Sequence, residues 1–188
     1  CLDSYFEQLS PLTPLSTEIR RCIIDEDEIS DDASSNLRQI RRSMNQINDK
    51  VHATLNGLVN GSLRSYLQDP IITMRGDRYV IPVKSEYRGE VKGILHDTSA
   101  TGATLFIEPS SVVEANNEIR ELTVKESEEI KRILAELSSE VADISKVILM
   151  TYSVVSELDL IFAKSKFSLA FDCFRPVLND KGYLNLEK

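Results

Sequence analysis

The chain has 188 residues, of which 41% are hydrophobic and 28% charged, and its formal net charge is −8. These proportions are close to the globular average, so disorder along the whole chain is excluded. The negative charge also excludes a uniformly basic nucleic-acid-binding domain, so any contact with phosphate must come from a local group of basic side chains.

Cysteine spacing argues against a protein built on disulfides or zinc, and the lengths of the apolar runs argue against a membrane-spanning one. The cysteines at positions 1, 22 and 173 are odd in number and widely separated, which argues against a disulfide framework and a zinc knuckle and favours free thiols in a reducing compartment. No apolar run approaches the roughly 20 residues that span a bilayer. Because the chain opens on Cys1 rather than on methionine and a signal peptide, we expect a segment excised from a larger cytoplasmic protein.

The first 56 residues predict two helices separated by an acidic loop at residues 25–32. The first helix lies within residues 1–24, and Pro14 suits its first turn. The second helix covers residues 33–56, with stop signals at Asn56-Gly57 and Asn60-Gly61. Apolar residues recur at steps of three and four in this second helix, at Leu37, Ile40, Met44, Ile47, Val51 and Leu55.

Residues 71–109 contain four of the seven glycines and predict a small antiparallel β unit. One hairpin would join residues 71–74 and 79–83 through Arg75-Gly-Asp-Arg78, and a second would join residues 94–95 and 104–107 around Gly102. Because proline cannot donate to a strand ladder, Pro82 predicts an edge strand or a bulge.

Residues 110–175 contain neither glycine nor proline and predict long helices with a heptad-like apolar seam. One break is expected near Thr151-Tyr-Ser153, and residues 183–186 have short-strand character. The helices at 33–56 and 110–150 each need a partner for one apolar face, so we expect them to pack antiparallel. The predicted fold is therefore mainly α, a long antiparallel helical arm that carries a small antiparallel β insertion at its tip.

No catalytic or metal-binding constellation is found. The phosphate-loop pattern is missing, and the only histidines, His52 and His96, are far apart and lack paired cysteines nearby. His96-Asp-Thr-Ser99 contains hydrolase residue types, but adjacent residues of a strand point to opposite faces. A polar turn, in which Asp97 and Ser99 bond to the backbone, is the expected structure. We therefore expect no cofactor, metal or catalytic residue in this chain.

The β unit also carries a group of basic residues that are candidates for binding nucleic acid. Acidic residues are interspersed among them, so an ordinary solvated hairpin and a one-sided strip that contacts phosphate both remain open. A strip is possible because Arg78 and Lys84 share a strand face if Pro82 adds no bulge. The Glu-rich stretch 114–140 is instead expected to be a solvated helix face, with pairs such as Glu128–Arg132. The candidate residues are Arg75, Arg78, Lys84, Arg88, Lys92 and His96.

Several segments of this sequence resemble the bacterial MutS-II family. The similarity is carried by Met74-Arg-Gly-Asp-Arg-Tyr-Val-Ile-Pro-Val-Lys84 and by Ile94-Leu-His-Asp-Thr-Ser-Ala-Thr-Gly-Ala-Thr-Leu-Phe-Ile-Glu-Pro109. Val113-Glu-Ala-Asn-Asn-Glu-Ile-Arg-Glu-Leu122 and Asp32-Ala-Ser-Ser-Asn-Leu-Arg-Gln-Ile-Arg41 extend it. The resemblance implies core and ascending lever helices in residues 1–70, a clamp-like β unit in 71–109, descending lever and core helices in 110–175, and the lead-in to an ATPase domain in 176–188.

The same resemblance implies what the whole protein does. Members of the family are homodimeric ATPases that resemble the mismatch-repair protein MutS and carry an Smr endonuclease domain. They act on branched DNA to suppress recombination, or on stalled, collided ribosomes. ATP and Mg²⁺ would belong to the absent ATPase domain, and DNA or ribosomal RNA would meet the β tip. The alternative is a coiled-coil protein-interaction scaffold without nucleic-acid contact. A bacterial, cytoplasmic location is expected, with no membrane partner.

Overall fold

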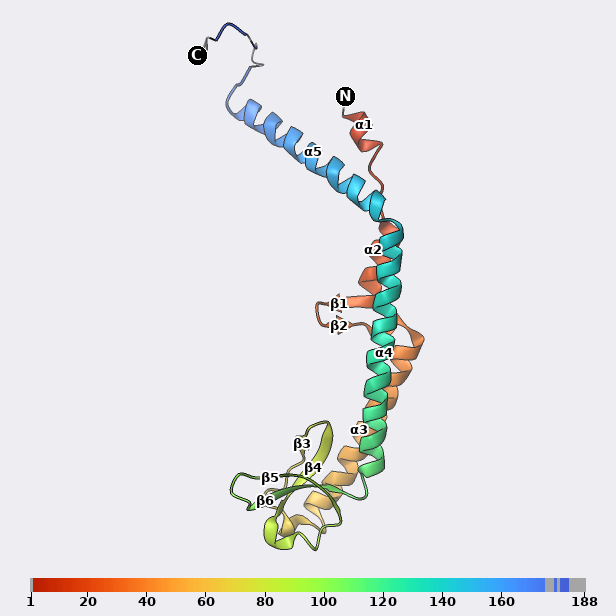
Figure 1. Cartoon of the computed structure of the whole chain (residues 1–188), viewed down its shortest axis with the longest axis vertical. Coiled ribbons are helices and arrows are strands. Elements are labelled where there is room, and N and C mark those ends of the chain that lie inside the picture. Colours follow the sequence, from red (N-terminus) through yellow and green to blue (C-terminus); the bar gives the residue numbers. More distant parts are fainter. Residues whose placement is uncertain (1, 175–177, 179, 183–188) are drawn as a thin grey trace. The chain divides into compact units, whose positions relative to one another are not determined.

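The computed structural model describes residues 2–174, 178 and 180–182, and the fold is mainly helical with two small antiparallel sheets (Figure 1). Two compact units are present: residues 14–138, and residues 1–13 together with 139–188. The elements are α1 (Asp3–Phe6), α2 (Thr13–Cys22), β1 (Ile23–Asp25), β2 (Glu28–Ile29), η1 (Asp31–Ala33), α3 (Ser35–Asn60), η2 (Arg64–Tyr66), β3 (Thr73–Arg75), β4 (Arg78–Lys84), η3 (Ser85–Tyr87), β5 (Gly93–Thr98), β6 (Thr104–Pro109), α4 (Val113–Asp143) and α5 (Ser145–Ala170), where η marks a 3-10 helix.

The N-terminal region differs from its prediction in two places. The helix predicted within residues 1–24 is α2, with Pro14 in its first turn, and a separate short helix, α1, precedes it. The acidic segment expected to be a loop includes the hairpin β1–β2, in which Ile23 pairs with Ile29. Arg41 on α3 holds the end of this hairpin, because its guanidinium donates to the Ile29 carbonyl (2.7 Å) and to the Asp31 carboxylate (2.6 Å). No local sequence pattern predicts contacts between this segment and a side chain of α3.

Helix α3 begins with a side-chain cap and continues past its first predicted stop signal. The Ser34 hydroxyl accepts a hydrogen bond from the Leu37 amide (2.9 Å), which satisfies one of the free amides at the helix start. The helix passes through Gly57, where a side chain would meet nothing within 4 Å, and ends at Asn60, with Gly61 as the C-terminal cap. Glycine inside a helix costs only about 1 kcal/mol, so tertiary packing can carry the helix across it.

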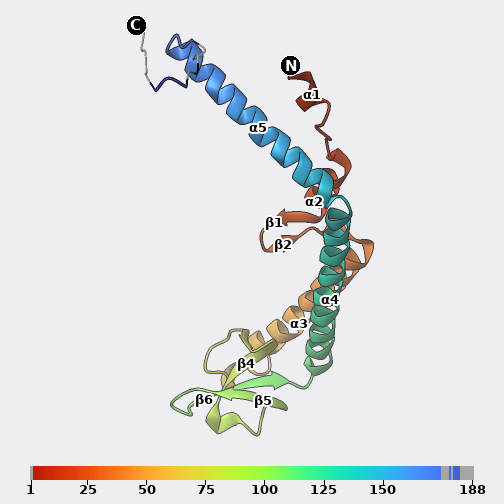
Figure 2. The ribbon, with the colours of Figure 1, turned by 45° about the horizontal axis from the view of Figure 1, so that its top comes forward.

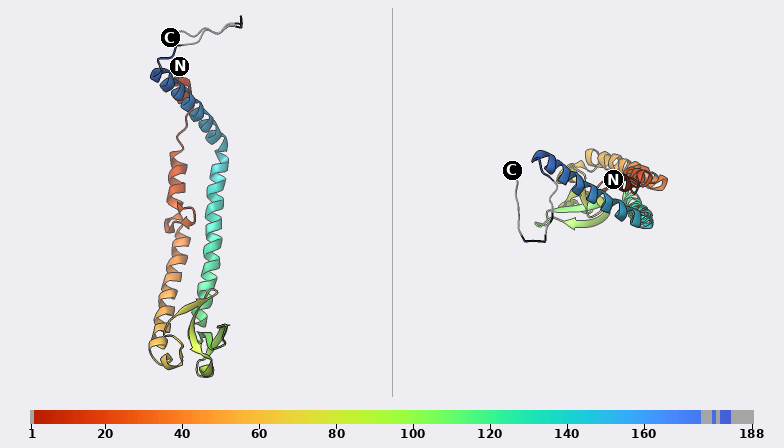
Figure 3. Two further views of the ribbon diagram at one scale, coloured as in Figure 1. Left: turned by 90° about the vertical axis from the view of Figure 1, so that its left-hand side faces the viewer. Right: turned by 90° about the horizontal axis from the view of Figure 1, so that it is seen from above.

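Helices α3 and α4 run antiparallel and side by side (Figures 1 and 3). Near the start of α3, the buried Leu37 packs with Ile133 and Leu137 of α4. Further along, the Arg41 side chain donates to the Glu126 carboxylate (2.6 Å). The opposite order of these contacts along the two helices confirms the antiparallel pairing that their apolar seams predicted.

The four-stranded sheet lies at the end of this helix pair, where α3 ends and α4 begins (Figure 2). Its strand order is β3-β4-β6-β5, with antiparallel pairs throughout. Both predicted hairpins are confirmed, and their turns contain Gly76 (φ 57°) and Gly102 (φ 72°), at backbone angles that favour glycine. The sheet shares one core with α3 and the start of α4, formed by Val51, Leu55, Val59, Leu67, Ile81, Val83, Val91, Ile107 and Val112.

The position of Pro82 corrects the prediction of an edge strand or a bulge. Strand β4 is interior, and Pro82 pairs in regular register with Phe106 of β6. On the other side of β4, pairing with β3 ends at Val80, and the Pro82 carbonyl accepts instead from the Gln68 amide (2.9 Å). In an antiparallel strand the nitrogen and the carbonyl of one residue face the same neighbouring strand. The Pro82 nitrogen therefore faces the β3 side of β4, at a position beyond the end of β3, so the missing N–H removes no hydrogen bond to β3.

The unit formed by residues 1–13 and 139–188 contains α5, which is apolar on several faces. The helix begins after Ile144, whose backbone (φ −109°, ψ 13°) leaves the helical region. The predicted break near Thr151 is therefore wrong, since Thr151 lies inside α5. Val154 and Leu158 are buried, whereas Leu149, Tyr152, Leu160, Phe167 and Leu169 are more than half exposed.

Candidate nucleic-acid interface

The structure divides the six candidate residues of the β unit into two groups with different electrostatic surroundings. Arg75, Arg78 and His96 contact carboxylates of the sheet. Lys84, Arg88 and Lys92 form no ion pair with any residue that the structure describes. The even spacing does place Arg78 and Lys84 on one face of β4, and no bulge interrupts the pairing of β4 with β6.

The first group centres on Glu108, whose side chain is fully buried. Arg78 donates to Glu108 Oε1 (2.9 Å), and the His96 Nε2 atom lies 2.5 Å from Glu108 Oε2. Asn116, at the start of α4, donates to Glu108 Oε1 (2.7 Å) and to the Tyr79 carbonyl (3.2 Å). These bonds connect β4, β5, β6 and α4, so we call Arg78, His96, Glu108 and Asn116 the Glu108 cluster.

Hydrogen bonds keep Glu108 charged in spite of its burial. Burial by itself raises the pKa of the Glu108 carboxyl. The bonds from Asn116, His96 and Arg78 act in the opposite direction and outweigh burial, so the pKa lies below its usual range. The Arg78 charge is therefore neutralised within the sheet, and its second guanidinium nitrogen is bonded to Asn117 Oδ1 (2.6 Å).

Arg75 is also neutralised at close range. Its Nε atom donates to Asp97 Oδ2 (3.0 Å), and its guanidinium carbon lies 3.6 Å from the centroid of the Phe106 ring. The side chain thereby links β3 to β5 across the face of β6. Asp97 also accepts from the Thr98 amide (2.8 Å), and Ser99 accepts from the Thr104 amide (3.0 Å), which confirms the predicted bonds of Asp97 and Ser99 to the backbone. The turn predicted at His96–Ser99 is wrong for residues 96–98, which belong to strand β5, and the turn itself follows from Ala100.

Two members of the second group, Lys84 and Arg88, have uncharged hydrogen-bond partners. The Lys84 ammonium donates to the Ser65 carbonyl (3.4 Å) and lies 5.9 Å from the centroid of the Tyr87 ring. Arg88 donates to the carbonyls of Val91 (3.2 Å) and Gly93 (3.4 Å). Lys92 is exposed. Neutral carbonyls position Lys84 and Arg88 without cancelling their charge. We call Lys84, Arg88 and Lys92 the uncompensated basic set.

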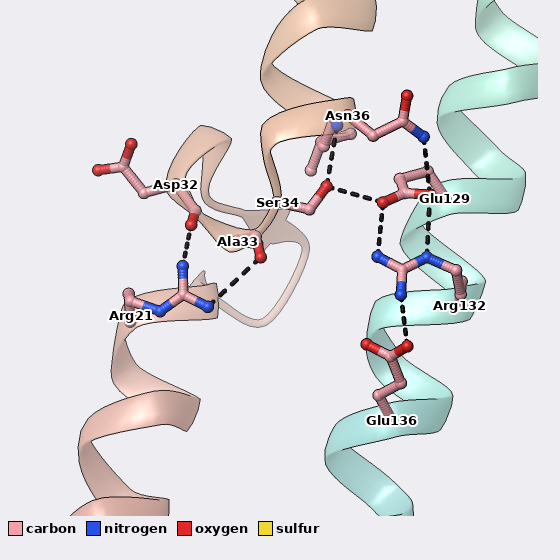
Figure 4. Close-up of polar contacts among 9 residues, drawn as sticks. Arg21, Asp32, Ala33, Ser34, Asn36, Glu129, Arg132 and Glu136 are labelled. Carbon is pink, nitrogen blue, oxygen red and sulfur yellow. Dashed lines mark hydrogen bonds and ion pairs between the residues drawn. The ribbon is translucent and has the colours of Figure 1, made fainter.

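A second polar cluster joins the start of α3 to α4, and sequence reasoning missed it (Figure 4). Glu129 is buried rather than solvated, and it accepts from Ser34 Oγ (2.7 Å) and Asn36 Nδ2 (2.9 Å). Arg132 donates to both Glu129 oxygens (2.7 and 3.0 Å) and also pairs with Glu136. The predicted Glu128–Arg132 pair is therefore wrong. Glu129 lies in line with Ile133 and Leu137, a helical spacing that could have indicated its burial.

We expect the Glu129 carboxylate to make the free energy of unfolding depend on pH. Hydrogen bonds from Arg132, Ser34 and Asn36 lower the pKa of Glu129 to about 2. A carboxyl whose pKa falls on folding stabilises the native state above its unfolded pKa and loses that effect as pH falls through the folded value. The Glu129→Gln variant should therefore be less stable than wild type at pH 6, with the difference shrinking between pH 4.5 and 2.

Urea unfolding at pH 6, 4 and 3 measures this difference. Glu128→Gln, a change at the exposed neighbouring residue, is the control and should leave the pH dependence unchanged. Parallel stability curves for Glu129→Gln and wild type would contradict the assigned role of the carboxylate.

The described residues contain no group of three or more His, Cys, Asp or Glu side chains placed to hold a metal ion. Among the helices of these residues, none is both long enough and apolar enough to cross a membrane.

Comparison with known proteins gives similarity along the whole of this chain to MutS2 proteins. The chain is 52% identical over 187 residues to Endonuclease MutS2 of Caldanaerobacter subterraneus subsp. tengcongensis, and 48% identical over 188 residues to Endonuclease MutS2 of Lachnospira eligens. Both matches cover 100% of this chain and 24% of the relative. Endonuclease MutS2 of Clostridioides difficile is 48% identical over 174 residues, or 92% of this chain.

No protein-family profile matches the sequence. The chain spans about a quarter of the length of the curated relatives that it matches. The matched region includes the helices and the β unit alike, since it covers 100% of this chain. By this similarity, the chain belongs to the MutS-II family, within the portion that these proteins share with it.

Proposed function

We propose that this chain is a non-catalytic part of a MutS2 protein, and that its β unit contacts the phosphate backbone of nucleic acid. The observation that supports this most directly is the uncompensated basic set. Lys84, Arg88 and Lys92 lie in one stretch of the β unit, and two of them are positioned by neutral carbonyls. A phosphate group supplies the negative charge that the protein itself does not provide at these residues.

The ligand in this proposal is branched DNA or the RNA of a stalled, collided ribosome. Both present phosphates, so the same cations serve either. The antiparallel helices α3 and α4 would act as lever segments, and the sheet between them as a clamp. An ATPase domain elsewhere in the protein, using ATP and Mg²⁺, would move the helices within a homodimer. A rigid helix transmits such a displacement without chemistry of its own.

Charge reversal within the uncompensated basic set tests the proposal. We expect Lys84→Glu combined with Lys92→Glu to weaken binding of the chain to a four-way DNA junction and to an rRNA helix. Each lost phosphate contact should lower the salt slope by about one, so the double variant should lose about two. The measurement is the dissociation constant of each ligand at two salt concentrations.

Lys125→Glu combined with Lys131→Glu is the matched control, because it makes the same change in net charge on exposed positions of α4. This control variant should keep the wild-type salt slope. If the variant in the β unit and the control variant bind alike, the β unit is not the phosphate-binding surface. A loss for only one of the two ligands would identify which nucleic acid the β unit prefers.

The second candidate function is a protein-interaction scaffold, which the exposed apolar side chains of α5 favour. Leu149, Leu160 and Phe167 are 66%, 54% and 60% exposed and lie close to one line along the helix. A scaffold binds through apolar area, so its affinity depends weakly on salt, whereas phosphate binding depends on salt steeply. The salt series described above therefore separates the two functions.

A further inference from the structure

Two tyrosines lie against each other beside the uncompensated basic set. The ring centroids of Tyr66 and Tyr87 are 5.1 Å apart, with the ring planes inclined at 39°. Tyr66 ends η2 and Tyr87 ends η3, and both rings are half-buried, so each packs on the core of the β unit and also reaches solvent. We call Tyr66 and Tyr87 the tyrosine pair.

The chain segments on either side hold this pair in place. Leu67, directly after Tyr66, forms a β-bridge with Val83, and the Gln68 amide donates to the Pro82 carbonyl (2.9 Å). These bonds fix η2 against β4, while η3 continues directly from β4 at Ser85. The two rings therefore meet because two turns far apart in sequence are attached to the same strand.

Positive charge adjoins the rings directly. The Lys84 ammonium lies 5.9 Å from the centroid of the Tyr87 ring, and it donates to the carbonyl of Ser65, the residue before Tyr66. Arg88 follows Tyr87 and is anchored to two carbonyls. Aromatic rings beside cations with uncompensated charge are the combination that proteins use to bind single-stranded nucleic acid, where bases stack and phosphates pair with cations.

We propose that the tyrosine pair stacks on unpaired bases, and that Lys84 and Arg88 hold the adjacent phosphates. This inference rests on the proposed function and narrows its ligand to nucleic acid with single-stranded nucleotides. A continuous duplex satisfies the cations but hides the faces of its bases. The tyrosine pair therefore adds affinity only for a strand whose bases are open.

The test compares a 20-nucleotide oligothymidine strand with a blunt 20-base-pair duplex, both bound to the complete 188-residue chain. Tyr66→Leu combined with Tyr87→Leu keeps apolar packing and removes the aromatic faces. We expect this variant to bind the single strand at least about five-fold more weakly and the duplex equally well. Tyr66→Phe combined with Tyr87→Phe is the matched control. It keeps the rings, and it should bind both ligands as wild type does.

A second measurement does not depend on any variant folding. A single strand that contains 2-aminopurine should lose fluorescence on binding to the wild-type chain, because stacking quenches this base. Unchanged fluorescence in the bound complex overturns the stacking inference, as does a Leu variant that is folded and binds the single strand normally.

The two sets of variants distinguish failure of the proposed phosphate contact from failure of the proposed base stacking. If Lys84→Glu with Lys92→Glu weakens binding to strand and duplex while the Leu variant has no effect, the phosphate contact stands and stacking is wrong. If neither variant changes binding to either ligand, both proposals fail.

Discussion

Replacement of Glu108 by alanine is expected to lower the free energy of unfolding by about 3 kcal/mol. The Glu108 side chain is fully buried, and it neutralises Arg78, whose side chain is only 18% exposed. Removing one partner of a buried ion pair leaves the other charge uncompensated in a poorly hydrated site. The same change leaves the Asn116 amide without its closest acceptor (2.7 Å). Urea unfolding followed by circular dichroism measures the effect.

Glu86→Ala is the matched control for this variant, because Glu86 is an exposed glutamate of the same β unit. It should change stability by less than about 0.5 kcal/mol. Replacing both members of the pair, as Glu108→Leu with Arg78→Met, should recover part of the loss, because no buried charge then remains without a partner. If Glu108→Ala is as stable as wild type, the Glu108 cluster does not hold the sheet to α4.

Replacement of Ile133 by aspartate should lower the free energy of unfolding by at least about 3 kcal/mol. Ile133 is 3% exposed and packs with Leu37, Leu137 and Cys22. An aspartate at this position either buries an unpaired charge or separates α3 from α4. Ile130, which the apolar seam also marks, is only half-buried and should tolerate the same change better. Thermal unfolding of the complete chain measures the loss.

Leu134→Asp provides the control, since Leu134 is the next residue of α4 and is 39% exposed. The two variants add the same charge at adjacent positions of one helix, and they differ in which side of the helix receives the carboxylate. Equal melting temperatures for both would show that α3 and α4 do not share this core.

The sequence alone determined the features that depend on local periodicity. Steps of three and four placed Leu37, Val51 and Leu55 on the buried side of α3, because a helix brings such residues to one face. Glycines at positions 76 and 102 located both hairpin turns, since backbone angles with positive φ favour glycine. The MutS-II resemblance was likewise visible in continuous segments, and identities of 52% and 48% to MutS2 proteins along this chain confirm it.

Only the tertiary structure decided which charges are neutralised. Arg78 and Glu108 are 30 residues apart, and Ser34 and Glu129 are 95 apart, so no local pattern joins them. The interior place of Pro82 also depends on neighbours brought close by folding. A list of basic residues therefore could not separate Arg75, Arg78 and His96, which stabilise the sheet, from Lys84, Arg88 and Lys92, whose charge is uncompensated. The physical reason is that the attraction between a cation and a carboxylate depends on the distance between them, and for these residues the fold sets that distance.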